Sequence, residues 1–349
     1  MSYAYDDRTI FVLGSPRSGT AWLSKLFDSH PDALYRHEPD IAVRNYEIPT
    51  ICELQQAEQF IPQTQAWLNA LAERRCLKAA GPLPMFAKNY RGPVASKLRL
   101  GLIALVKAAE RTPVVRRFTN SLEISDFADP RSAARRRFVI SSVSAMGRAG
   151  LLSRAAPESR FILVLRHPWG QIESYLRMPE MAGTERFDEL MTVLAGTEQG
   201  RRRNLDPAKL AKLPPMAQLA WAWVIHNEIA LEQLAGAKHF TAERLFDLTQ
   251  NPVAAGKRLF DFCGLSWGEQ TEKYIAWSTE ATGKEGYYNL RRNAADATWG
   301  WRRRLTQEQI DSITEVIADS VPGQMFMNDQ EPKPVEVANG GAHSLGGES

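Results

Sequence analysis

The segment 9–28 constrains the fold most strongly. Thr9-Ile-Phe-Val-Leu13 is a continuous apolar run of strand-forming residues, and the loop Gly14-Ser-Pro-Arg-Ser-Gly19 follows it directly. A helical spacing of apolar residues begins after Thr20, at Trp22, Leu23, Leu26 and Phe27. A continuous apolar strand is typical of a parallel sheet that is buried on both faces. The segment therefore predicts a strand, loop and helix unit at the start of an α/β domain.

The rest of the chain repeats this alternation after an interruption. We expect further strands at 33–36, 137–141, 161–165 and 244–248, and helices at 20–29, 147–155, 169–177, after Pro215 and after Pro252. Residues 41–132 carry helical patterns and scattered prolines without clear strands. This order predicts an α/β, P-loop-like three-layer fold with a mostly parallel central sheet and an inserted helical cap at 41–132. We expect one domain over 1–327 and a disordered tail over 328–349.

Composition excludes several classes of function. The 349 residues carry a net charge of only +3, which gives no reason to expect nucleic acid as a partner. The three cysteines are far apart and the histidines show no metal-ligand spacing, so we expect reduced thiols, a cytoplasmic location and no metal. The N-terminus has no signal-peptide pattern, and no apolar run approaches the roughly 20 residues that span a bilayer.

The first loop has the chemistry of an anion site. Backbone N–H groups and the positive end of the following helix would point at one spot, which suits phosphate or sulfate. A nucleoside-triphosphate P-loop would continue with Lys and then Ser or Thr. Here Thr20 stands in place of that Lys and Ala21 in place of the magnesium-binding hydroxyl, while Arg17 supplies positive charge inside the loop. An ordinary tight turn between strand and helix is the structural alternative.

A second motif lies at the strand expected over 161–165. Arg166 follows this strand directly, at the edge where open α/β sheets bind ligands, and Ser174 lies eight residues further on, on the next helix. Both side chains can bind the same anionic oxygens. Taken alone, an arginine after a strand is more often a salt-bridge partner.

The two motifs together resemble those of the sulfotransferase family, whose donor is 3′-phosphoadenosine 5′-phosphosulfate (PAPS). The stretch Gly-Ser-Pro-Arg-Ser-Gly-Thr-Ala-Trp-Leu at 14–23 resembles the family's 5′-phosphosulfate loop, and Arg166 with Ser174 resembles its 3′-phosphate motif. The resemblance is best over 8–40 and 137–180. It implies that PAPS is held by Arg166, Ser174 and the loop residues Ser15, Pro16, Arg17, Ser18, Gly19, Thr20 and Ala21.

The resemblance is looser further along the chain. Thr298-Trp-Gly-Trp-Arg302 and the arginines after it resemble a late basic loop that closes over the nucleotide, so Arg302 is a further candidate for PAPS binding. A basic helix start packed by tryptophan is an equal alternative. Arg17 stands where small-molecule members usually have Lys, which is closer to carbohydrate-type and bacterial members. The strand at 138–141 also lacks a Lys that many relatives have.

The transfer of a sulfuryl group to a hydroxyl needs a general base. Glu38 follows the strand expected over 33–36, which we expect to neighbour the first strand, and a Glu there is the usual base of carbohydrate-type members. His37 is the second candidate, because its free pKa lies nearer neutrality. Arg17 would act on the sulfonate. A strand-end carboxylate that only caps or pairs with an arginine is the structural alternative for Glu38.

We expect the inserted cap at 41–132 to determine the acceptor, and this cap is the least readable part of the sequence. The resemblance implies a saccharide or lipid-linked hydroxyl, and a small molecule remains open. The basic, apolar stretch 97–117 would suit the inner membrane surface, or else form a buried helix with snorkelling ends. The oligomeric state has no signal in the sequence.

A P-loop nucleotide kinase and a non-catalytic anion-binding module are the competing functions.

Overall fold

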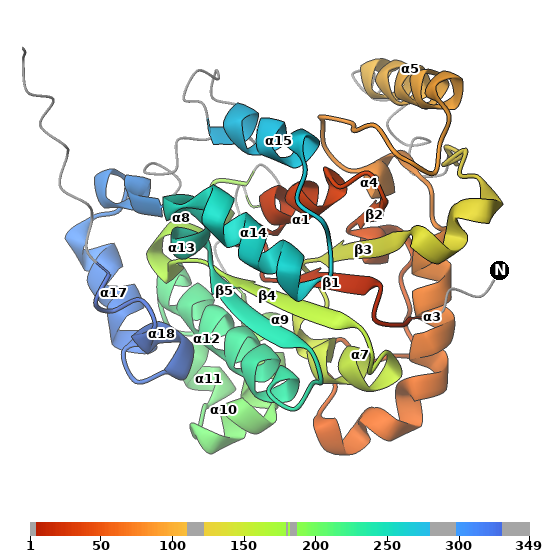
Figure 1. Cartoon of the computed structure of the whole chain (residues 1–349). Helices are drawn as coiled ribbons and strands as arrows, with labels where there is room; N and C mark the ends of the chain where they lie inside the picture. Colours follow the sequence, from red (N-terminus) through yellow and green to blue (C-terminus); the bar gives the residue numbers. More distant parts are fainter. Residues whose placement is uncertain (1–4, 110–121, 179–180, 182–186, 280–297, 330–349) are drawn as a thin grey trace, which may run out of the picture.

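The computed structural model describes residues 5–109, 122–178, 181, 187–279 and 298–329. Residues 110–117 of the membrane-contact stretch and 330–349 of the expected tail therefore lie outside the described residues. Figure 1 shows a twisted central sheet with helices on both of its faces. Among the described helices, none combines the length and apolar composition of a bilayer-spanning segment.

The sheet is parallel throughout its described strands. Its order is β2-β3-β1-β4-β5, and all four pairings are parallel. Four strands, β1 to β4, begin and end within one residue of where the sequence predicts them. The strands are β1 (Thr9–Leu13), β2 (Ala33–His37), β3 (Arg137–Ser142), β4 (Arg160–Leu165) and β5 (Phe240–Arg244).

Two expectations about the sheet were wrong. The strand expected over 244–248 ends at Arg244 instead, and Leu245–Gln250 is a helix. The polar edge strand β5 lacks the apolar run that reveals a buried strand, whereas the leucines after it mimic one. In addition, β2 does not neighbour β1, because β3 lies between them. The order of strands depends on crossover packing, which no local pattern records.

Helices fill the connections between strands. The pattern at 20–29 becomes a helix that ends at Asp28, and the helices expected after β4, Pro215 and Pro252 are present. The helical segments are α1 (Thr20–Asp28), α2 (Pro39–Ala42), η1 (Leu54–Phe60), α3 (Ile61–Glu73), α4 (Leu77–Ala80), α5 (Pro93–Ala109), η2 (Pro130–Arg135), η3 (Met146–Arg148), α7 (Ala149–Ala155), α8 (Pro168–Leu176), α9 (Asp188–Ala195), α10 (Glu198–Arg202), α11 (Pro207–Leu210), α12 (Pro215–Leu234), α13 (Leu245–Gln250), α14 (Pro252–Phe262), α15 (Glu269–Thr279), η5 (Gly300–Arg303), α17 (Gln307–Ile317) and α18 (Val321–Gln324).

Two hydrophobic cores lie on opposite faces of the sheet. Alternate residues of each strand point to opposite faces, so Phe11 and Leu13 enter one core while Ile10 and Val12 enter the other. The first core also takes residues of α3, α7, α12 and α17, and the second takes residues of α1, α14 and α15. This double burial holds the carboxyl ends of the strands in fixed positions.

Candidate functional site

The loop between β1 and α1 forms a tight cradle. Gly19 has a left-handed φ of 101° and begins α1 without a side-chain cap. A Cβ atom on Gly14 would lie 2.4 Å from Ser18 Oγ and 2.7 Å from the Val164 carbonyl oxygen. Glycine is therefore required at both ends of the loop. The uncapped N–H groups of α1 are free to face an anion.

Ser18 gives a second sign of a ligand at this loop. Its side chain is fully buried, yet among the described residues nothing hydrogen-bonds its Oγ. Buried hydroxyls in folded proteins almost always have partners. An anionic oxygen held in the cradle would satisfy this hydroxyl, so the residues fit a phosphate or sulfonate group.

The loop and the second motif meet in one place. Arg17 Nε donates to Ser174 Oγ at 3.0 Å, and Arg166 Nη1 donates to the Arg17 carbonyl oxygen at 2.9 Å. Gln171 Nε2 donates to the Pro16 carbonyl oxygen at 3.1 Å. Residues about 150 positions apart thus form a single basic site at the carboxyl edge of β1 and β4.

The late basic segment approaches the same site. The Arg302 guanidinium lies 4.8 Å from the ring centre of Trp299 and 5.3 Å from that of Trp301. Burial, together with the nearby charges of Arg302 and Arg166, lowers the pKa of His167 to about 3. Trp301 is buried and stacks on His167 with ring centres 5.0 Å apart. The Trp301 ring therefore packs inside the protein, as in the alternative of a basic helix start packed by tryptophan.

Glu38 and His37 stand at the end of β2, one strand further from the loop than expected. Glu38 has a left-handed backbone with φ 42°, and its N–H donates to the Ser141 carbonyl oxygen at 3.0 Å. Its carboxylate lies 3.8 Å from His37 Nε2 and 4.0 Å from Lys78 Nζ. Burial raises the pKa of Glu38, while the charges of Lys78 and Arg17 oppose that rise. The charge of Arg17 in the first loop thus acts on this carboxylate, although β3 lies between β1 and β2.

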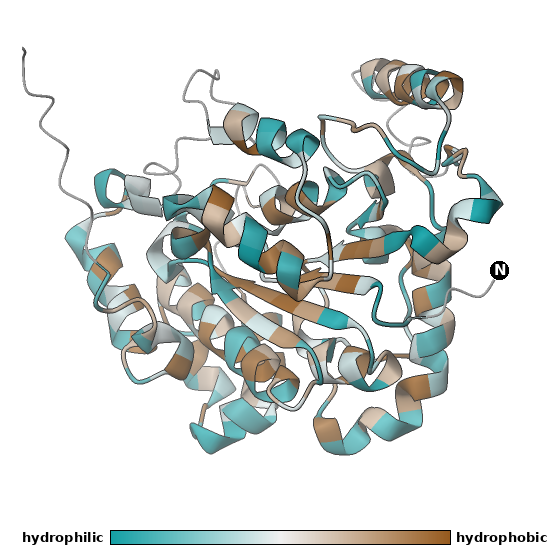
Figure 2. Cartoon of the chain, viewed as in Figure 1, coloured by the Kyte–Doolittle hydropathy of each residue, from teal (hydrophilic) through white to brown (hydrophobic). Residues whose placement is uncertain are grey.

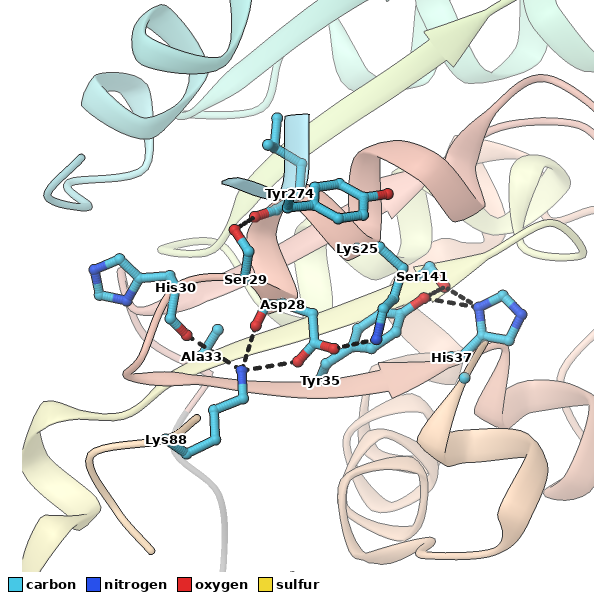
Figure 3. A network of polar contacts seen from close by, with 12 residues as sticks. Lys25, Asp28, Ser29, His30, Ala33, Tyr35, His37, Lys88, Ser141 and Tyr274 are labelled. Carbon is cyan, nitrogen blue, oxygen red and sulfur yellow. Dashed lines mark hydrogen bonds and ion pairs between the residues drawn. The ribbon is translucent and has the colours of Figure 1, made fainter. Parts of the chain in front are cut away.

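A network of polar contacts surrounds the end of β2 (Figure 3). The Tyr35 hydroxyl lies 2.7 Å from His37 Nδ1 and 3.2 Å from Ser141 Oγ. Burial lowers the pKa of His37 to about 3 and raises that of Tyr35, so the ring stays neutral and the phenol protonated near pH 7. The phenol can then donate to Nδ1, which leaves the ring proton on Nε2, facing Glu38.

The same network contains a buried carboxylate between two lysines. Asp28 lies 2.5 Å from Lys25 Nζ and 2.8 Å from Lys88 Nζ, and all three residues are buried (Figure 3). Burial alone would raise the pKa of Asp28, but the two lysines lower it to about 2. The network therefore fixes the end of α1 to the segment that carries Lys88.

A cavity of about 490 Å³ adjoins the loop at Ser15 and Pro16. Its size is typical of a small-molecule site. Most of its lining is apolar, and His226, Glu189 and Tyr175 are the ionisable residues among the lining. The carbonyl of Ala222 accepts from His226 Nδ1 at 2.8 Å, and burial lowers the pKa of His226. The neutral ring therefore presents Nε2 as a hydrogen-bond acceptor. The lining residues are Ser15, Pro16, Thr50, Ile51, Val143, Ser144, Met146, Gly147, Gln171, Ile172, Tyr175, Glu189, Leu190, Val193, Leu219, Ala222, Trp223 and His226.

The structure thus brings the first loop, Arg166 and Ser174 together, with Arg302 and Glu38 at the sides. Thr20 and Ala21 form the first turn of α1. The sequence analysis did not identify Gln171, Glu189 or His226 as site residues. No local motif marks these residues, because they become neighbours of the loop only in the folded chain. Among the described residues, no group of three or more His, Cys, Asp and Glu side chains could hold a metal, and the absence of a metal stays a prediction.

Solved structures of sulfotransferases resemble the chain at low sequence identity. The sulfotransferase domain of the Synechococcus PCC 7002 olefin synthase is 17% identical with a TM-score of 0.46, covering 92% of this chain and 95% of that one. The mouse sulfotransferase SULT7A1 in complex with PAP is 13% identical with a TM-score of 0.43, covering 93% and 89%. Sulfotransferase STF9 of Mycobacterium avium is 13% identical with a TM-score of 0.40, covering 93% and 78%.

Sequence comparison assigns the family. No curated protein sequence matches the chain significantly. The family model described as "Sulfotransferase family" matches residues 9–269, well over half of the chain, and includes the first loop, Glu38, Arg166 and Ser174. The chain therefore belongs to the sulfotransferase family.

Proposed function

We propose that the chain transfers the sulfuryl group of PAPS to a hydroxyl of an acceptor, without a metal. The observation that carries the proposal is the junction of Arg17, Arg166 and Ser174, which joins a sulfonate cradle to an arginine and a hydroxyl suited to a 3′-phosphate. The orphan hydroxyl of Ser18 supports an anion in the cradle. Arg302, whose charge acts on His167 as that of Arg166 does, would also bind the nucleotide.

In the proposed reaction, the acceptor oxygen attacks the sulfur of PAPS in line with the bridging oxygen to the nucleotide. The new S–O bond forms as the old one breaks, and 3′-phosphoadenosine 5′-phosphate (PAP) leaves. Arg17 and the N-terminus of α1 stabilise charge on the sulfonate. The acceptor proton passes to Glu38.

The contacts favour Glu38 over His37 as the base. Burial makes the Glu38 carboxylate more basic, and this carboxylate interacts electrostatically with Arg17 of the sulfonate cradle. His37 has a pKa of about 3 and its Nδ1 is bound by Tyr35. An Nε2 lone pair facing the carboxylate would be repelled, whereas an Nε2 proton is attracted. We therefore assign His37 to orienting Glu38.

The cavity beside Ser15 and Pro16 is the proposed acceptor site. Walls that include Leu190, Val193 and Leu219 cannot satisfy the hydroxyls of a bare saccharide. Among the acceptors expected from the sequence, the lining favours a glycolipid or another lipid-linked alcohol. Most of the lining lies outside 41–132, so the inserted cap contributes little beyond Thr50 and Ile51. We also propose a cytoplasmic location, supported by three free, buried cysteines.

Calorimetric titration with PAP, AMP and ATP–magnesium tests the donor. We expect metal-independent binding of PAP that is at least about tenfold tighter than that of AMP, because the 3′-phosphate gains charge-assisted hydrogen bonds. Arg166→Ala should remove most of this preference, and Arg202→Ala, at an exposed surface pair, should not. A preference for ATP–magnesium would support a nucleotide kinase instead.

A matched pair of acceptors tests the cavity. An alkyl glucoside should be sulfated with at least about tenfold higher kcat/KM than free glucose, because its chain buries apolar surface. Val193→Asp should remove this advantage without changing PAP affinity. Equal rates on both acceptors would contradict the apolar acceptor site while leaving the donor site intact.

A further inference from the structure

Helix α5 (Pro93–Ala109) is oriented opposite to an ordinary surface helix. Its buried residues are Arg99 and Ile103, whereas the side chains of Val94, Leu98, Leu102 and Leu105 are 82%, 52%, 36% and 66% exposed. These four residues, the outer stripe, have the spacing with which helices normally face a core. The stripe faces outward instead.

Polar contacts fix this orientation. Arg99 Nη2 lies 3.3 Å from Asp126 Oδ1, and Arg99 Nε donates to the Ser125 carbonyl oxygen at 3.2 Å. Lys107 Nζ donates to the Gly81 carbonyl oxygen at 3.0 Å. Turning α5 to bury the outer stripe would break these bonds and leave Asp126 without one of its cations. The exposure is therefore enforced by the fold.

The helix that carries the outer stripe has basic residues but no acidic residue of its own. Residues 93–109 contain Lys97, Arg99 and Lys107 but no Asp or Glu, and Lys97 is exposed next to Leu98. Leu100 is also 47% exposed on the same helix. Figure 1 places α5 at the rim of the molecule, away from the sheet, and Figure 2 shows its hydrophobic turns. An apolar stripe with cations and no anions is complementary to an anionic lipid surface.

We propose that the outer stripe of α5 binds the surface of an anionic bilayer. The helix would lie in the plane of the interface, with Val94, Leu98, Leu102 and Leu105 among the acyl chains. Lys97 would reach the lipid phosphates by extending its stem along the apolar surface. Such binding would bring the enzyme to acceptors that reside in membranes, but the inference rests on α5 alone and holds whatever the acceptor is.

Flotation of the full chain with lipid vesicles tests the proposal. We expect binding to equimolar phosphatidylglycerol–phosphatidylcholine vesicles and little binding to phosphatidylcholine alone. The double variant Leu98→Ser, Leu105→Ser should bind at least about tenfold more weakly, because two apolar side chains no longer enter the acyl region. Lys97→Gln should weaken binding about fivefold, since one cation near such a surface contributes ~1 kcal/mol.

A matched control uses exposed valines far from α5 in the sequence, at Val253 and Val321. The double variant Val253→Ser, Val321→Ser should bind vesicles like the parent chain. Because every substituted residue is exposed, thermal unfolding should show that all variants fold. Equal vesicle binding by the α5 variant and the parent would overturn the proposal. A lipid-free dimer that the α5 variant disperses would overturn it too, by assigning the stripe to a second copy of the chain.

Discussion

Arg17 donates a hydrogen bond of 3.0 Å to the hydroxyl of Ser174, and this contact joins the first loop to α8. Ser174→Ala removes the acceptor of this bond and one proposed ligand of the 3′-phosphate. We expect PAP affinity to fall about tenfold and AMP affinity to fall less, because a lost hydrogen bond to a charged group costs ~1.5 kcal/mol or more. Calorimetry measures both.

Ser153→Ala is a suitable control, since the Ser153 hydroxyl donates to the Gly150 carbonyl oxygen within α7. It should leave both affinities unchanged. If Ser174→Ala also left PAP affinity unchanged, Ser174 would have only a structural role.

Glu38→Gln should abolish most turnover while keeping nucleotide binding. Removing a general base typically lowers the rate by about 10²–10⁴, and the amide cannot accept the proton. Rapid-quench measurement of kcat and calorimetry with PAP separate the two effects. Glu58→Gln, at an exposed carboxylate, should behave like the parent chain. Full turnover in Glu38→Gln would support the alternative that Glu38 only pairs at a strand end.

The pH dependence of turnover should also show that Glu38 is the general base. The base must be ionised, so kcat should fall as pH decreases through the pKa of Glu38. Burial raises that pKa, which places the acid limb above the usual range of a glutamate. Removing the opposing charge in Lys78→Met should move the limb to higher pH. An unmoved limb would argue against Glu38 as the titrating group.

Gly14→Ala should disrupt the first loop. The added Cβ would approach the Val164 carbonyl oxygen to 2.7 Å, and this backbone atom cannot move aside cheaply. We expect a drop of at least about tenfold in PAP affinity and a lower melting temperature. Gly236→Ala provides the matched control, because nothing lies within 4 Å of its added Cβ. Parent-like PAP binding by Gly14→Ala would show that the loop is not a tight cradle.

Asp28→Asn should destabilise the fold by about 3–5 kcal/mol near neutral pH, because it leaves Lys25 and Lys88 buried without their carboxylate. The folded pKa of Asp28, about 2, lies below its ordinary value of 3.8. The carboxylate therefore stabilises the fold fully above pH 3.8, and this contribution is lost as pH falls toward 2.

Urea unfolding at several pH values measures the difference. The gap between parent and Asp28→Asn should be widest near pH 7 and should narrow below pH 4. Asp261→Asn, at an exposed position, should show no comparable gap. If the difference in unfolding free energy did not change with pH, the destabilisation would not come from the loss of the Asp28 charge.

The parts of the fold that the sequence predicted are those with a strong local pattern. Phe161–Leu165 and Thr9–Leu13 are continuous apolar runs because helices cover both faces of their strands, so they were recognisable without a structure. The edge strand at Phe240–Arg244 has no such run and was placed four residues too late. The neighbour of β2 was also wrong, because strand order is decided by the packing of connections.

In the candidate site, too, the residues in local motifs were predictable from the sequence, and those brought together only by folding were not. The loop at 14–19 and the Arg166–Ser174 spacing are short motifs whose backbone setting follows from strand and helix patterns. The cavity is different, because segments that are distant in the sequence, from Ser15 to His226, contribute residues without a recognisable motif to it. The tautomer of His37 likewise depends on Tyr35, which lies beside it only because alternate residues of β2 share one face.

The ion cluster around Asp126 has a consequence for protein engineering. Arg36 of β2 is fully buried and lies 2.6 Å from Asp126 in the inserted segment, and Asp126 also binds Arg99 of α5. Excising 41–132 to obtain a minimal enzyme would strand the Arg36 guanidinium inside the protein, two residues before Glu38. Such a truncation would need an uncharged replacement for Arg36, so the inserted segment and the strand that ends before Glu38 have to be redesigned together.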